Sequence, residues 1–391
     1  MLFSSDPAQV RGAEPLGIGD DERERAEHLG TVAQDSGGDA HGLDGARERV
    51  PPQRLPDALE QPVAGGPELA AHDDPLGVEA VDEHGQRSPD RAAGVVEHAA
   101  GDLITVLRAG TPLGDLALGD QQLALDAPAG ATVGGVVATG ASGPRRLHYG
   151  TARDLLIGIT VVRPDGVVAK AGGKVVKNVA GYDLGKLYTG SYGTLGLITE
   201  CVFRLHPRPM ASVYVRSTAP AQAVPAILAA QVAPTAIELD TATGELTVLL
   251  EGTPAGVRER SALIEKLLAG EVSEAAPGWW GRDPWAADEI GMKLSVPLSK
   301  VPALVGLGSA LRGSAGTGVL YAAARDITEV ERLRAECVRG GGHAVVLTAP
   351  AEVRDILDMW GPVPGLAVMR RIKDQFDPEH RFAPGRFVGG I

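Results

Sequence analysis

The sequence predicts an α+β protein in which a β-rich region is followed by a region of alternating strands and helices. Three observations support this: composition changes near residue 90, apolar runs separated by turns follow up to His206, and regular alternation begins after Pro209. We therefore predict four segments: 1–90, 91–208, 209–364 and 365–391.

Residues 1–90 differ in composition from the rest of the chain. They contain no Lys, Tyr, Trp or Cys and are rich in Asp, Glu, Gly, Ala, Arg, His and Pro. They show neither the alternation of a strand nor the periodicity of a long helix. Such a stretch cannot bury enough apolar surface to offset its ordering entropy. Two interpretations stand: a disordered acidic extension, or a segment that is out of frame.

The second segment reads as strands joined by turns. Order is expected from Val95 onward, with a strand at 102–110 followed by a short helix that Thr111 caps and Pro112 begins. Later strands are predicted at 155–162, 167–171 and 195–205. The turn Pro164-Asp165-Gly166 joins the first two of these, since Pro presets φ and Gly accepts a positive φ.

After Pro209, short strands and helices alternate, which predicts an α/β cap region with a mostly antiparallel sheet. The strands are predicted at 213–216, 236–240, 245–251, 293–296, 318–322 and 344–347. The helices are predicted at 219–231, 256–268, 298–311, 327–339 and 369–376.

Composition excludes several classes of function. The formal net charge of −13 argues against nucleic-acid binding, which favours a basic surface. Cys201 and Cys337 form no CxxC pair, so no metal or iron–sulfur ligation by this chain is expected. Neither a membrane-spanning run nor a signal peptide is recognisable, so we expect a cytoplasmic protein that reaches a membrane only through partners.

Two glycine-rich segments, 130–146 and 190–196, are the strongest candidates for a binding site. Glycines allow close backbone approach, and hydroxyls follow at Thr132, Thr139 and Ser142. Thr132 is placed to cap a helix begun at Val133, whose amino end would favour an anion. A phosphate-bearing cofactor fits this pattern, and ordinary glycine-rich turns are the alternative.

Residues 131–200, ATVGGVVATGASGPRRLHYG through GSYGTLGLITE, resemble the PCMH-type FAD-binding domain of the vanillyl-alcohol-oxidase class. Within that class they are similar to the glycolate oxidase E subunits. The tail MRRIKDQFDPEHRFAPGRF, residues 369–387, resembles the closing segment of the same family. The likeness implies that the last 27 residues, 365–391, return to the FAD domain after the cap region.

The resemblance implies FAD as the cofactor and assigns neither a catalytic residue nor a metal. The residues that it implies contact FAD are Thr132, Gly134, Gly135, Thr139, Ser142, Gly143, Gly196 and Ile198. The family commonly has Asn where this chain has Gly140, so a side-chain contact is lost there.

The resemblance also implies a function. It implies an FAD-dependent subunit that oxidises a small 2-hydroxy acid, such as glycolate to glyoxylate, by hydride transfer to flavin. A related flavoprotein subunit and an iron–sulfur subunit that accepts the electrons are the implied partners. The alternatives are a non-catalytic structural or relay subunit, or a defective product unable to hold FAD.

The first half of the family's FAD domain has no counterpart in residues 1–90. Gly37-Gly38 and Gly65-Gly66 lack flanking strands. This favours the view that the segment is out of frame or otherwise replaced.

Several other polar residues have both a functional and a structural interpretation. One interpretation is that they face the flavin or a partner, and the other is a surface salt bridge or a packed aromatic ring. These residues are Arg145, Arg146 and Tyr149. His148 and His206 are candidate bases or structural histidines.

Three further groups have mainly structural readings. Cap or packing roles are expected for Lys174, Lys177, Asn178, Tyr182 and Asp183, and burial for Cys201. Packing, or cover for a ligand, is expected for Trp279, Trp280 and Trp285. Anion pairing or plain solvation is expected for Arg370, Arg371, Lys373 and Arg386.

Overall fold

The computed structural model describes residues 92–128, 130–174 and 182–391. Segment 1–90 of the sequence analysis therefore lies outside the described residues, as do Lys177 and Asn178. The strands form a five-stranded sheet, an eight-stranded sheet and one two-stranded pair. Each strand pairing within the described parts is antiparallel, which agrees with the α+β prediction and with the antiparallel cap sheet.

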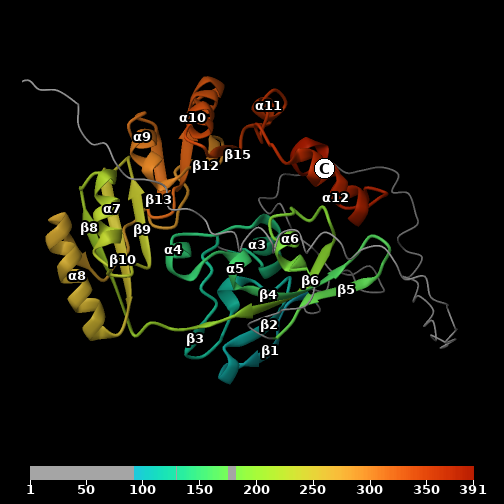
Figure 1. Ribbon diagram of the computed structural model, residues 1–391, viewed down its shortest axis with the longest axis horizontal. Coiled ribbons are helices and arrows are strands. Elements are labelled where there is room, and N and C mark those ends of the chain that lie inside the picture. Colours follow the sequence, from blue (N-terminus) through green and yellow to red (C-terminus); the bar gives the residue numbers. More distant parts are fainter. Residues whose placement is uncertain (1–91, 129, 175–181) are drawn as a thin grey trace, which may run out of the picture. The chain divides into compact units, whose positions relative to one another are not determined.

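The five-stranded sheet contains the β-branched runs of the second segment (Figure 1). In sheet order its strands are β1 (Val95–Ala99), β2 (Ile104–Arg108), β6 (Leu197–Arg204), β4 (Leu156–Val162) and β5 (Val168–Gly172). The turn between β4 and β5 forms as predicted, because Gly166 has φ +79° and donates to the Arg163 carbonyl.

Short helices pack against this sheet and complete its apolar core. They are α3 (Val133–Thr139), α5 (Ala152–Leu155) and α6 (Leu184–Tyr188). Asp183 caps α6 by accepting from the Lys186 N–H, as the cap reading expected. The remaining short elements of this region are η3 (Ala100–Asp102), η4 (Leu113–Asp115), β3 (Gln121–Gln122), α4 (Arg146–Tyr149) and β7 (His206–Pro207).

The eight-stranded sheet is built entirely from residues after Pro209. In sheet order its strands are β11 (Glu271–Ser273), β8 (Ala211–Ser217), β10 (Glu245–Gly252), β9 (Ala236–Asp240), β13 (Ala310–Ser314), β14 (Val319–Ala324), β12 (Ile290–Ser295) and β15 (His343–Thr348).

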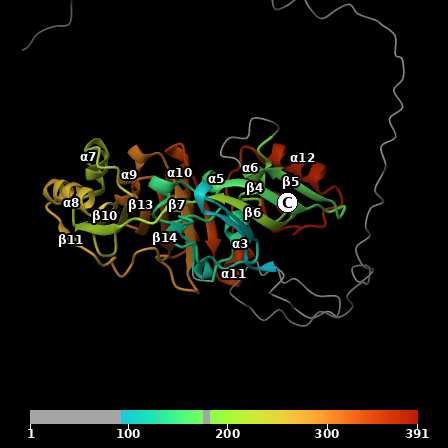
Figure 2. The same ribbon diagram turned by 90° about the horizontal axis from the view of Figure 1, so that it is seen from below.

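The two faces of this sheet differ in polarity. One face carries side chains such as Ile237, Leu246 and Met292, which join one buried core with the helices of this region. Figure 2 shows these helices along one side of the sheet. These helices are η5 (Ala221–Ala223), α7 (Val224–Ala229), α8 (Pro254–Leu268), η6 (Leu298–Lys300), α9 (Val301–Val305) and α10 (Ile327–Arg339). Because side chains alternate along a strand, the neighbouring positions face the other way, and many of them are polar.

Two predictions for local structure are wrong. The helix predicted at 298–311 ends at Val305, and the chain re-enters the sheet as β13 after Gly308, which has φ +73°. Thr111 caps no helix; its hydroxyl accepts from the N–H of Gly94 and donates to the carbonyl of the same residue. A hydrogen-bond partner just before β1 therefore replaces the local cap.

The C-terminal segment contains α11 (Ala351–Arg354), α12 (Leu366–Phe376) and η7 (Val388–Gly390). Ile372 and Phe376 of α12 pack against the core of the five-stranded sheet. Within the described ranges, no helix combines the length and the apolar character that crossing a bilayer requires.

Candidate functional site

Helix α3 begins where the sequence predicted, but its first N–H groups are already engaged. Thr132 caps the helix by accepting from the Gly135 N–H at 3.2 Å. The N–H groups of Val133 and Gly134 donate to the carbonyls of Thr111 and Ala109. Neighbouring backbone therefore accepts hydrogen bonds from two of the first N–H groups of this helix.

The next predicted contacts also have structural roles. A Cβ on Gly134 would lie 2.7 Å from the Ala109 Cβ, so glycine allows α3 to meet the end of β2. The Thr139 hydroxyl donates back to the Gly135 carbonyl at 2.8 Å. Gly134 and Thr139 therefore each have a structural role in the packing of α3 that requires no ligand.

The two glycine-rich segments meet at the carboxyl end of α3. Gly140 ends the helix with φ +64°, a left-handed conformation that suits glycine or the family's asparagine. The Gly190 N–H donates to Val137 O at 2.9 Å and the Tyr192 N–H donates to Ala138 O at 2.8 Å. The structure therefore brings together residues that lie about 50 positions apart in the chain.

The last two predicted FAD contacts lie at the start of β6. A Cβ on Gly196 would lie 3.2 Å from the carbonyl oxygen of Val162. The Ile198 side chain is buried in the apolar core of the five-stranded sheet, and Ile198 is paired with Val161 of β4.

The loop after α3 is anchored by an ion pair. Gly143 lies so close to Asp126 that a Cβ would be 2.3 Å from the Asp126 Cβ. Asp126 accepts from the Arg145 N–H at 2.8 Å and from Arg145 Nε at 2.7 Å. The salt-bridge reading of Arg145 is therefore confirmed, and the loop that contains Ser142 is held in place.

Helix α4 contacts the cap sheet through two side chains. Arg146 donates to the Ser142 and Gly143 carbonyls and to the hydroxyl of Tyr321 on β14. Tyr149 donates to the Glu251 carboxylate on β10 at 3.0 Å. Burial and the neighbouring Glu251 charge raise the pKa of Tyr149 to about 12, so its hydroxyl remains a donor.

A polar cleft of about 430 Å³ opens between this loop and the polar face of the cap sheet. Its cationic side chains are Arg146, Arg153 and Lys293, and His343 adds an imidazole. The other lining residues are Gly140, Ser142, Thr151, Thr189, Ser295, Thr317 and Val319. A cleft with this lining suits a ligand that carries negative charge.

Burial and neighbouring positive charge lower the pKa values of two basic groups of the cleft. Burial and the nearby Arg146 charge lower the pKa of Lys293. Burial and the Lys293 charge lower the pKa of His343 below its usual value, so its imidazole is neutral near pH 7.

Behind the cleft, Glu238 on β9 is almost fully buried and its Oε1 has no hydrogen-bond partner within the described structure. Burial raises the Glu238 pKa to about 8, so this carboxyl is protonated at neutral pH.

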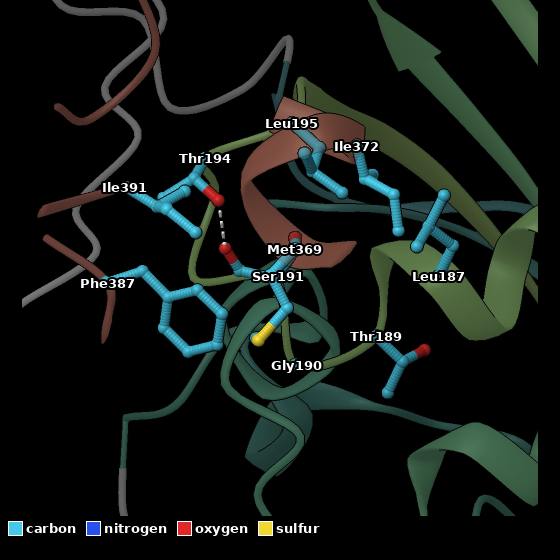
Figure 3. A pocket seen from close by; sticks show the side chains of 10 residues that line it. All are labelled: Leu187, Thr189, Gly190, Ser191, Thr194, Leu195, Met369, Ile372, Phe387 and Ile391. Atoms are coloured by element: carbon cyan, nitrogen blue, oxygen red, sulfur yellow. Dashed lines mark hydrogen bonds between the residues drawn. The ribbon is translucent and has the colours of Figure 1, made fainter. Parts of the chain in front are cut away.

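A second cavity, of about 190 Å³, lies between the turn of residues 190–196 and the C-terminal segment (Figure 3). Apolar side chains such as Leu195, Met369 and Phe387 line it, and Thr189 lines both this cavity and the cleft. Thr189, just before the turn, is therefore shared by a cationic space and an apolar one.

The remaining sequence candidates fall into structural positions. Cys201 is fully buried in β6, and burial raises its thiol pKa, as its packing role predicts. His206 is half-buried, its Nε2 has no partner among the described residues, and burial lowers its pKa. His148 is exposed. Tyr182 is 91% exposed, so no packing role is visible for its side chain in the described parts.

The tryptophans of the cap region pack against their surroundings. Trp279 is buried beneath the Arg312 guanidinium, 5.9 Å from the ring centroid, and Trp280 meets Tyr214 edge-on. Trp285 meets Tyr321 at a centroid distance of 6.0 Å, which supports packing rather than cover for a ligand.

The reading of Lys373 as a solvated charge is wrong. Its side chain is fully buried and bonded to Asp377, because α12 turns this face toward the five-stranded sheet. Arg371 is exposed, as that reading predicted.

Sequence reasoning missed Lys293, Ser295 and His343, which come from strands β12 and β15. Their signal is the alternation of polar and apolar residues, since Met292 and Leu294 face the core on either side of Lys293. That alternation indicates that one side of the sheet is polar, but it does not show which part of the chain lies opposite that side.

Comparisons with known proteins agree with this fold. A family described as "FAD binding domain" matches residues 89–172. Glycolate oxidase subunit GlcE of Escherichia coli (strain K12) is 32% identical over 319 residues, which cover 76% of this chain and 85% of that protein. Glycolate oxidase subunit GlcD of Bacillus subtilis (strain 168) is 42% identical over 112 residues, 27% of this chain and 24% of that protein.

Solved structures share the fold at low identity. Xylooligosaccharide oxidase from Myceliophthora thermophila C1 superposes with a TM-score of 0.50 at 16% identity, covering 74% of this chain and 79% of that one. Alkyldihydroxyacetonephosphate synthase superposes with a TM-score of 0.51 at 18% identity, covering 74% of this chain and 66% of that one.

The sheet with its glycine-rich loop and the antiparallel cap define a flavin-dependent oxidoreductase fold. The chain belongs to the FAD-linked oxidases with a PCMH-type FAD-binding domain. Its cofactor is FAD.

The described residues fit one side of FAD. Gly190 and Gly193 have open space where a Cβ would lie, so a flat ring can approach the backbone there. The Ser142 hydroxyl, which no other described residue engages, and the cationic cleft supply polar groups. The donors at the start of α3 are used by backbone carbonyls.

Proposed function

We propose that this chain is an FAD-binding subunit of a glycolate-oxidase-type complex that oxidises a small 2-hydroxy acid, with glycolate to glyoxylate as the type reaction. The main support for this proposal is the cationic cleft, because it is lined by Ser142 of the loop that the family likeness assigns to FAD. The names of its relatives, glycolate oxidase subunits and D-lactate dehydrogenases, support a hydroxy acid as substrate.

In this proposal FAD contacts the residues that the family likeness assigned: Thr132, Gly134, Gly135, Thr139, Ser142, Gly143, Gly196 and Ile198. The hydrogen bonds already made at the start of α3 favour the residues that follow this helix, and of these Ser142 lines the cleft. We also propose that segments 91–208 and 209–364 are the FAD and cap domains and that 365–391 returns to the FAD domain. Residues 1–90 then stand in place of the family's first half-domain.

The substrate carboxylate lies between Arg146 and Lys293 in this proposal. The Arg146 guanidinium is held by two backbone carbonyls and Tyr321, which fixes its direction before substrate arrives. Charge-assisted hydrogen bonds to a carboxylate are about twice as strong as neutral ones.

His343 accepts the proton of the substrate hydroxyl. Its imidazole lines the cleft and is neutral near pH 7, which is the form that a general base needs. When bound, FAD accepts the hydride that leaves the substrate carbon. The hydroxy acid thereby loses one hydride and one proton and becomes the 2-oxo acid.

The proposed partners are a related flavoprotein subunit and an iron–sulfur subunit that takes the electrons. The matches to subunits GlcE and GlcD support membership of such a complex. The sequence holds two cysteines, both buried and in different sheet regions, whereas an iron–sulfur cluster uses four ligands.

The visible spectrum of the purified chain tests the function. Flavin absorption near one FAD per chain, bleached by glycolate without oxygen, is the expected result. Lys293→Met should raise the substrate concentration for half-maximal bleaching about 10- to 100-fold, the loss of one charged hydrogen bond. Exposed Lys300→Met is the matched control.

A second candidate is a non-catalytic structural or relay subunit. The engaged N–H groups at the start of α3 favour it, because they leave fewer donors for a pyrophosphate. In that case no 2-hydroxy acid bleaches flavin, whether or not the chain holds FAD. A folded chain that takes up no added FAD rejects the first candidate, and a colourless chain that aggregates indicates a defective product.

A further inference from the structure

Lys373 and Asp377 form a fully buried ion pair at the end of α12. Both side chains are 0% exposed, and the Lys373 Nζ lies 2.6 Å from the Asp377 Oδ2. Burying two charges removes them from water at a high cost, so such a pair needs further hydrogen bonds to persist.

Those further bonds connect two distant parts of the chain. The Lys373 Nζ donates to Thr194 O at 2.7 Å and to Phe382 O at 2.9 Å. The Asp377 carboxylate accepts from the N–H groups of Arg381 and Phe382. The ammonium thus has three acceptors, so the pair is complete without a ligand.

The Thr194 carbonyl belongs to the turn of residues 190–196. The other anchors of this turn are the Gly190 and Tyr192 N–H groups, which donate to the carboxyl end of α3. Tyr192 has φ +56°, which is unusual for a residue with a side chain, and its ring stacks on Phe387 at 5.1 Å. The turn is therefore held from one side by α3 and from the other by the C-terminal segment.

Packing beneath the turn is incomplete. Leu195, Met369 and Ile372 line the cavity of about 190 Å³ (Figure 3). The buried Ser191 hydroxyl at its edge donates no hydrogen bond to any described residue. Apolar contacts are lost across a cavity. The hydrogen bond from Lys373 to the Thr194 carbonyl therefore contributes more to holding this turn than it would in a fully packed core.

We propose that Lys373 and Asp377 are positioning residues that hold the turn of residues 190–196 at the place where it contacts FAD. The inference rests on the proposed function, since Gly196 and Ile198 are the proposed FAD contacts that follow Thr194. Neither charge touches FAD; the pair acts through the Thr194 carbonyl.

The test is FAD titration of the full chain, followed by flavin fluorescence, with Lys373→Met/Asp377→Leu as the variant. Changing both charges avoids an unpaired buried ion and nearly conserves volume. We expect at least tenfold weaker FAD binding, altered visible circular dichroism of the bound flavin, and a cooperative urea transition with a lower midpoint, because the partners of both charges lose their hydrogen bonds. Arg371→Met, which removes an exposed charge from the same helix, should leave FAD binding unchanged.

A variant that folds and binds FAD as tightly as the wild type overturns the positioning role and leaves the proposed function intact. A wild-type chain that binds no FAD overturns both. If the variant does not fold, hydrogen exchange of the wild type decides: FAD should slow exchange in residues 190–198 and in α12 together. Slowing in the turn alone overturns the proposal.

Discussion

Gly143→Ala should destabilise the protein by crowding the loop beside the cleft. The added Cβ would lie 2.3 Å from the Asp126 Cβ, whereas ordinary contacts begin near 3.4 Å. Asp126 must therefore move by about 1 Å, and overpacking of this size costs about 1–3 kcal/mol. Displacing the partly exposed Asp126–Arg145 ion pair adds up to about 1 kcal/mol.

Urea unfolding followed by far-ultraviolet circular dichroism measures this cost. Gly101→Ala is the matched control, because its added Cβ would meet no atom within 4 Å. The Gly143 variant should lose about 1–4 kcal/mol of unfolding free energy, the sum of the two costs above, and should bind FAD more weakly than the control. A loss within about 0.5 kcal/mol of the control would refute the close packing of this loop.

Three further predictions concern buried polar groups. The thiols of Cys201 and Cys337 are buried with raised pKa values, so a thiol reagent at pH 8 should modify neither in the native chain and both in denaturant; rapid native labelling would contradict this. Tyr149→Phe should lower the free energy of unfolding by about 1–2 kcal/mol, since it removes the hydrogen bond to Glu251; an unchanged urea midpoint would refute that bond. Glu238 has a folded pKa of about 8 against about 4.3 unfolded, so unfolding releases a proton and stability should fall as pH rises through this range. Glu238→Gln should remove that loss, and parallel pH curves of the urea midpoint would reject the shift.

Local patterns predicted those parts of the fold that depend on nearby residues. Strand 236–240 and helix 327–339 have the predicted bounds. The signals for them, alternating side chains for the strand and an N-cap residue for the helix, lie in adjacent positions of the sequence. The segment 298–311 was mispredicted because its apolar residues fit a helix. Leu311 instead belongs to a strand whose neighbours, β9 and β14, supply its hydrogen bonds.

The candidate site could be predicted only in part. Glycines and hydroxyls mark the loop after α3, so its place beside the cleft agrees with the sequence. Lys293 and His343 reach the same cleft through the pairing of β12 with β15, which no local pattern reveals. Lys373 meets the Thr194 carbonyl across 179 positions, so its burial depends on the complete fold.

The central claim is that FAD lies along the loop of residues 140–143 and beneath the polar face of the cap sheet. A crystal structure of the full chain with FAD tests it most directly. The account predicts the flavin ring in the cleft, with Ser142 on one side and Lys293 and His343 on the other. A flavin bound elsewhere, or a cleft filled by protein when FAD is present, would contradict it.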